Sequence, residues 1–117
     1  MNPPHLLRAF LATCSGLAAA FRSERSFRTE IGLLAVALPA AFALTPDAFR
    51  RAELIACLLA VLAIELLNTS VEKLCDRLAP EPDARIKIVK DMGSAAVFAA
   101  LCMAGVLWIG AAAERFW

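Results

Sequence analysis

The feature that most constrains this chain is an uncharged stretch near its C-terminus, residues 92–113. It holds 22 residues without a single Asp, Glu, Lys or Arg, and about 20 apolar residues suffice for a helix to cross a bilayer. In lipid, only helices and closed barrels satisfy their backbone hydrogen bonds. The stretch therefore predicts a transmembrane helix.

Two earlier apolar stretches predict two more spans. Residues 54–71 are interrupted only by Glu65, Asn68 and hydroxyl groups. Residues 31–44 are uncharged, but 14 residues make only about 21 Å of helix, so this span needs its flanks. Pro39 inside it is tolerable in lipid. We expect spans at about 29–48, 50–78 and 86–114.

The composition agrees with one small membrane domain covering residues 1–117. The chain is 61% hydrophobic and has no Tyr, which is more apolar surface than a soluble domain of this size buries. A net charge of +1 indicates no nucleic-acid partner. The four cysteines form no close pair and accompany one histidine, so neither a disulfide framework nor a zinc site is expected.

The N-terminal segment, about residues 4–25, predicts an amphipathic helix lying on the membrane surface. Its larger apolar side chains fall within one arc at helical spacing, with Arg8, Ser15 and Arg22 beside that arc. We thus expect an all-α integral membrane fold, in which an N-terminal amphipathic surface helix precedes three transmembrane helices.

Turn residues set the limits of the second span. Thr45, Pro46 and Asp47 predict a turn before a helix, with Pro46 as the first helical residue and Asp47 in the first turn. The same helix is expected to continue to about Leu78, because two prolines follow in residues 79–82.

Basic residues predict the orientation, since they concentrate on the cytoplasmic side of a membrane. Nine of the 12 basic residues fall before the first span or between the second and third. The N-terminus should therefore be cytoplasmic and the C-terminus periplasmic. The three on the other side are Arg50, Arg51 and Arg115.

Four polar residues of the second span fall on one helical stripe: Glu65, Asn68, Glu72 and Asp76. At about 100° per residue they share an arc of about 80°. Polar groups of this kind can join helices across an interface. Because a carboxylate within a span is costly, however, it more often marks a functional site.

Three acidic residues near the cytoplasmic face suit Mg²⁺, which binds one or two carboxylates together with substrate phosphates: Glu24, Glu72 and Asp76. Lys90 and Asp91 add a cation for a phosphate and an acceptor for a hydroxyl. Simpler interpretations remain open, in which Glu24 pairs with Arg28 and Lys90 is a basic anchor at the membrane surface. The glycine-rich phosphate-binding loops of common nucleotide-binding folds are absent from the sequence.

Three segments together resemble the prokaryotic diacylglycerol kinase family of small membrane lipid kinases. They are residues 65–77, which read ELLNTSVEKLCDR, the KDMGSAAV stretch at residues 90–97, and ERSFR at residues 24–28. The resemblance covers nearly the whole chain. It implies a homotrimer whose active sites are shared between neighbouring subunits at the cytoplasmic face.

The resemblance also implies roles for individual residues. Glu65 corresponds to the general base that takes the proton from the lipid hydroxyl. The remaining expected roles are Mg²⁺ binding by Glu24 and Glu72, ATP binding by these two with Glu81, Asp83, Lys90 and Asp91, lipid contact by Arg28, Glu30, Glu65 and Ser94, and support by Asn68 and Asp76.

The expected reaction is ATP- and Mg²⁺-dependent phosphorylation of diacylglycerol to phosphatidic acid at the inner membrane of a bacterium. One alternative within the same family is an undecaprenol kinase, which residues 67–69 with Glu72 and Lys73 resemble, whereas residues 90–97 resemble the diacylglycerol enzymes. Another alternative is a proton-coupled carrier that uses Glu65 as its proton site. The carrier is less favoured, because residues 31–44 and 92–113 offer no charge across the outer half of the membrane.

Overall fold

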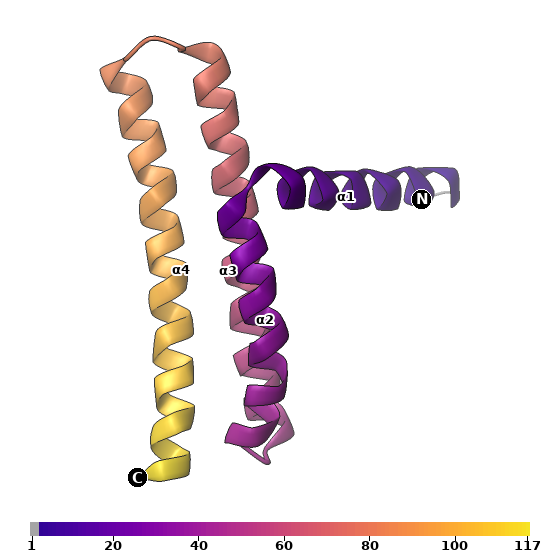
Figure 1. The fold of residues 1–117 in the computed structure, drawn as a ribbon, viewed down its shortest axis with the longest axis vertical. Coiled ribbons are helices and arrows are strands. Elements are labelled where there is room, and N and C mark those ends of the chain that lie inside the picture. The colour runs from indigo at the N-terminus through magenta and orange to yellow at the C-terminus, as the bar shows by residue number, and fades with distance from the viewer. Residues whose placement is uncertain (1–2) are drawn as a thin grey trace.

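The computed structural model describes residues 3–117, and these form four helices. They are α1 (Pro3–Ser23), α2 (Arg25–Leu44), α3 (Ala48–Leu78) and α4 (Ala84–Phe116). Figure 1 shows α2, α3 and α4 as a column, with α1 leaving it sideways. The helices α2, α3 and α4 are long and apolar enough to cross a membrane. The predicted fold, a surface helix followed by three spans, is confirmed.

The helix ends follow local sequence signals, with one correction to the predicted start of α3. Pro46 is not helical; Asp47 is the N-cap, and its side chain accepts a hydrogen bond from the backbone N–H of Phe49 at 3.2 Å. A carboxylate at the N-cap satisfies an amide that has no partner within the helix. The predicted end of α3 at Leu78 is confirmed. Helix α2 runs through Pro39 without a break.

The lengths of the helices place the site. At about 1.5 Å per residue, the 20 residues of α2 match a hydrocarbon core of about 30 Å. The 31 residues of α3 and the 33 of α4 exceed it by several turns. Both therefore project beyond the apolar layer, and Figure 1 shows their connecting loop above the level at which α1 joins the column.

The packed core lies between α3 and α4 and is built from small side chains. Ala100, Ala104 and Ala111 are the buried residues of α4, and such residues let helices approach closely in a membrane. Trp108 packs against this core and donates its indole N–H to the backbone oxygen of Leu54 at 3.3 Å. Most larger apolar side chains are exposed, as expected where lipid or another subunit covers them.

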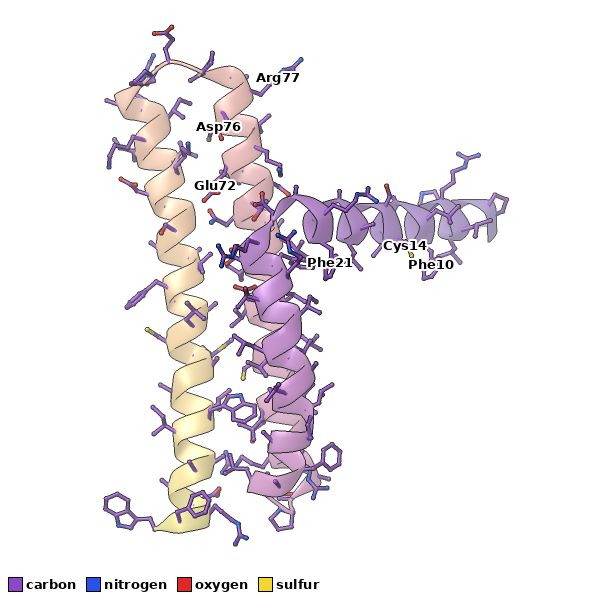
Figure 2. The ribbon with its side chains drawn as sticks, in the orientation of Figure 1. Phe10, Cys14, Phe21, Glu72, Asp76 and Arg77 are labelled. Atoms are coloured by element: carbon purple, nitrogen blue, oxygen red, sulfur yellow. The ribbon has the colours of Figure 1, made fainter. Side chains whose placement is uncertain are left out.

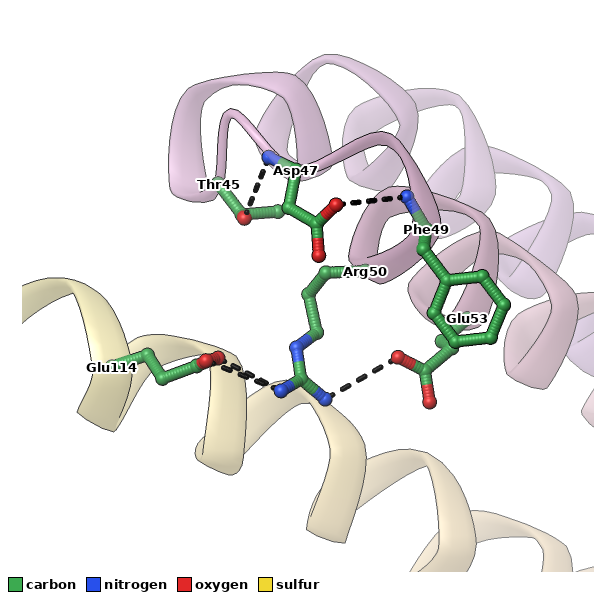
Figure 3. Close-up of polar contacts among 6 residues, drawn as sticks. All are labelled: Thr45, Asp47, Phe49, Arg50, Glu53 and Glu114. Carbon is green, nitrogen blue, oxygen red and sulfur yellow. Dashed lines mark hydrogen bonds and ion pairs between the residues drawn. The ribbon is translucent and has the colours of Figure 1, made fainter.

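Polar contacts join α3 and α4 at the end of the bundle that is remote from their connecting loop, as Figure 3 shows. The guanidinium of Arg50 on α3 lies 2.9 Å from Glu114 on α4 and 3.3 Å from Glu53. These three residues join the start of α3 to the end of α4, at the end remote from the predicted site.

Candidate functional site

The predicted polar stripe lies along α3, and its upper part projects beyond the level of α1. Figure 2 shows Asp76 in this upper part and Glu72 near the level of α1. The amide Nδ2 of Asn68 donates to Oε1 of Glu72 at 3.1 Å, one helical turn further on. The hydrogen bond confirms that these two residues share a face of α3. Glu65, which lies deeper, is half-buried.

The Asn68 amide also contacts α4. Its Oδ1 is buried and has no hydrogen-bond partner among the described residues. A Cβ added at Gly93 of α4 would collide with this oxygen, so the amide lies directly against the α4 backbone. The stripe on α3 is therefore fitted to the segment of α4 that follows Lys90 and Asp91.

Glu24 reaches α3 from the junction of α1 and α2. Its carboxylate lies 3.2 Å from Nζ of Lys73, the residue that follows Glu72. The simpler interpretation, a pair between Glu24 and Arg28, is wrong for this structure. Arg28 instead donates to the backbone oxygens of Phe21 at 2.7 Å and Arg22 at 3.1 Å.

Arg28 satisfies backbone groups at the end of α1, because the last carbonyls of a helix lack hydrogen-bond partners within it. By bonding two of them, the guanidinium holds the corner between α1 and α2. Arg28 is exposed, and its role at the corner was not predicted from sequence.

Two carboxyl groups meet deeper in the bundle. Glu30 of α2 and Glu65 of α3 interact directly with each other, and Oε2 of Glu30 is buried without a hydrogen-bond partner among the described residues. The structure thus brings together two of the residues expected at the lipid. Ser94, a third, is exposed on α4.

An open cavity of about 530 Å³ lies beside the loop between α3 and α4, and four of the predicted site residues line it. Lys90 lies 2.7 Å from Oδ1 of Asp76, across the two helices. Asp83 is the N-cap of α4 and accepts from the backbone N–H of Arg85 at 2.9 Å. The four residues are Asp76, Glu81, Asp83 and Lys90.

Lys87 is a cavity residue that the sequence interpretation missed. It lines the loop cavity and pairs with Asp91 at 2.7 Å. Lys87 lies three residues before Lys90, so both ammonium groups fall near the same helical face. This spacing could have identified Lys87 from the sequence. Asp91 does not line the cavity and is exposed.

A larger groove of about 800 Å³ lies between α1 and α3. Apolar and small residues line most of it, with Arg22 and Lys73 as its cations. The sequence did not predict this groove, because it depends on the angle at which α1 leaves α2.

The comparisons with known proteins decide the family. Residues 12–111 match the family model for prokaryotic diacylglycerol kinase. The chain belongs to this family. Its relatives include the diacylglycerol kinase of Haemophilus influenzae, 38% identical over 91% of this chain and 90% of the relative. The diacylglycerol kinase of Pseudomonas aeruginosa is 42% identical over 88% and 84%, and that of Escherichia coli K12 is 35% identical over the same shares.

Within this prokaryotic diacylglycerol kinase fold, the donor chemistry suits Mg²⁺. Glu24 and Glu72 supply carboxylate oxygens, the ligand class that Mg²⁺ prefers. The ion pair of Glu24 with Lys73 brings Glu24 to the part of α3 that carries Glu72. Among residues 3–117, no three acidic, His or Cys side chains gather as a metal cluster.

Proposed function

We propose that the chain is an ATP- and Mg²⁺-dependent kinase that phosphorylates the primary hydroxyl of diacylglycerol and so makes phosphatidic acid. Membership of the prokaryotic diacylglycerol kinase family carries this proposal, and the three relatives named above are all diacylglycerol kinases. The acidic stripe of α3 and the two lysines that line the cavity beside it supply the two kinds of group that phosphoryl transfer to an alcohol needs.

Glu65 would act as the general base. It lies in the predicted span, deeper than Glu72 along α3, next to Glu30. The carboxylate would take the proton of the lipid hydroxyl, while the hydroxyl oxygen forms a bond to the γ-phosphorus of ATP. The bond from that phosphorus to the β,γ-bridging oxygen then breaks, and ADP leaves.

The remaining residues would position the nucleotide and balance its charge, which is most of what catalysis of phosphoryl transfer requires. Lys90 and Lys87 carry ammonium groups at the loop cavity, where they would face phosphates. Glu81 and Asp83 would lie beside the nucleotide in the loop. Mg²⁺, held by Glu24 and Glu72, would neutralise phosphate charge.

We further propose that the protein functions as a homotrimer in the bacterial inner membrane, with its N-terminus in the cytoplasm and its C-terminus in the periplasm. The orientation rests on the distribution of basic residues. The many exposed apolar side chains of the spans offer surface for neighbouring subunits as well as for lipid. Arg28 and Ser94 would contact the lipid substrate.

The decisive experiment is a phosphorylation assay with labelled ATP, purified protein in lipid, and a panel containing diacylglycerol and undecaprenol. We expect labelled phosphatidic acid only when Mg²⁺ is present, and loss of labelling in Glu65→Gln. Preferential labelling of undecaprenol would move the protein to the other branch of the family. Proton flux in vesicles without ATP binding would favour a carrier instead, and equal activity of Glu65→Gln and wild type would overturn the assigned base.

A further inference from the structure

Gly93 differs from the other glycines of the described residues in what surrounds it. A Cβ added at Gly93 would overlap Oδ1 of Asn68 and lie 3.3 Å from its Cγ. At the other helical glycines, an added Cβ would have no atom within 4 Å apart from chain neighbours and its own helix backbone: Gly16, Gly32, Gly105 and Gly110. Gly93 is thus the one described position where the absence of a side chain is required by a neighbour.

Close packing of α3 and α4 does not by itself require glycine. The two helices pack elsewhere through alanines of α4, namely Ala100, Ala104 and Ala111. Alanine is also the better helix former, because glycine has greater backbone freedom to lose. The reason for a glycine at position 93 therefore lies in the side chain that faces it.

That side chain is the amide of Asn68, whose two ends have different environments. Its Oδ1 lies against Gly93, buried and without a hydrogen-bond partner among residues 3–117. Its Nδ2 donates to Oε1 of Glu72 at 3.1 Å. Because an amide is planar, the surface that limits Oδ1 also sets the direction of the Nδ2–H bonds.

We propose that Gly93 is a positioning residue for Glu72. Its missing side chain lets Oδ1 of Asn68 point directly at α4, and in that position the amide holds the Glu72 carboxylate in one orientation. This inference rests on the proposed function, in which Glu72 is a ligand of Mg-ATP. A methyl group at position 93 would displace Asn68, and Glu72 would lose the hydrogen bond that orients it.

The test compares wild type with Gly93→Ala, Asn68→Ala and the double variant, and uses Gly105→Ala as the matched control on the same helix. We expect Gly93→Ala to raise KM for Mg-ATP by about tenfold or more, since small misplacements of binding groups cost up to about 100-fold. KM for the lipid should change little. Gly105→Ala should retain wild-type constants, because nothing lies within 4 Å of its added methyl group.

The double variant tests the contact itself by thermal unfolding in detergent, without reference to activity. Asn68→Ala removes the atoms that a methyl group at position 93 would strike. In that background Gly93→Ala should no longer lower the melting temperature, whereas in wild type it should. Contacting residues show such non-additivity, and independent ones do not.

Three results would overturn the proposal. Additive changes in melting temperature would show that Gly93 and Asn68 do not interact. Interaction in the unfolding experiment with an unchanged KM for Mg-ATP would make Gly93 a packing residue only. Equal kinetic constants for Gly93→Ala and Gly105→Ala would do the same. Failure of the proposed function is distinguishable, because wild type itself would then lack kinase activity while the unfolding experiment still reports on the contact.

Discussion

Lys90 on α4 and Asp76 on α3, which both line the loop cavity, form an ion pair with Nζ and Oδ1 2.7 Å apart. Burial of the pair is modest, since the Lys90 side chain is 39% exposed and that of Asp76 67%. An exposed pair of this kind contributes little to stability. Its importance is therefore geometric: it holds a long, flexible ammonium group at one wall of the cavity.

Replacing Asp76 should accordingly weaken nucleotide binding more than folding. We expect Asp76→Asn to raise KM for Mg-ATP about threefold to tenfold and to leave the free energy of unfolding nearly unchanged. Kinase assays over a range of ATP concentrations measure the first, and unfolding in detergent the second. Glu53→Gln, at the other end of α3, removes the same charge and should leave KM unchanged. If the two variants behave alike, Asp76 has no role at the nucleotide.

Glu72 leads to a prediction about magnesium. If its carboxylate binds Mg-ATP, Glu72→Gln should raise the Mg²⁺ concentration for half-maximal activity by about tenfold or more, because a neutral amide is a weaker ligand for a hard cation. The amide of Gln keeps the size of the side chain, so packing against Asn68 should persist. A variant with the wild-type Mg²⁺ requirement would contradict the metal role.

The arrangement of helices was predictable because lipid leaves a chain few choices. Long uncharged runs must become helices in a membrane, and the prolines after Leu78 ended α3 where expected. At Asp47 the same kind of inference was wrong, because the predicted helix began at Pro46 whereas α3 begins at Ala48. The aspartate caps the helix from outside, since its carboxylate competes for the amide N–H of Phe49.

The partners of charged side chains were not predictable. Local spacing favoured a pair of Glu24 with Arg28, yet Glu24 pairs with Lys73. The reason is that the backbone oxygens at the end of α1 attract the guanidinium of Arg28. Likewise, the contact of Asn68 with Gly93 depends on how far α4 is shifted along α3. Neither the pairing of Glu24 with Lys73 nor the contact of Asn68 with Gly93 can be read from a short segment of sequence, because each joins residues far apart in the chain.

The cluster of Arg50, Glu53 and Glu114, at the end of the bundle remote from the site, yields a prediction about stability alone. Arg50→Ala breaks the contacts to Glu53 and Glu114, and these side chains are about one-third to one-half exposed. We expect a loss of about 0.5–1 kcal/mol in unfolding experiments, with kcat and KM unchanged. High salt should reduce the difference between variant and wild type, because it screens exposed charges. A large loss of kinase activity in folded Arg50→Ala would contradict the separation of this cluster from the site.

Asp83 combines two roles that a pair of variants can separate. Its carboxylate caps α4 by accepting from the backbone N–H groups of Arg85 and Ile86, and it lines the loop cavity. Asp83→Ala should lose about 1 kcal/mol of stability, whereas Asp83→Asn should keep most of it, since asparagine caps helices as well as aspartate. Both variants remove the negative charge that we place beside the nucleotide.

The kinetic constants of these two variants then assign the role of Asp83. If the charge acts on the nucleotide, Asp83→Asn should change KM for Mg-ATP although its melting temperature stays close to wild type. If only the cap matters, Asp83→Asn should resemble wild type in both measurements, and Asp83→Ala alone should be impaired. Asp47→Ala is the matched control, because Asp47 caps α3 at the remote end with one bond to Phe49. It should lose stability without a change in KM, since the loop cavity is untouched.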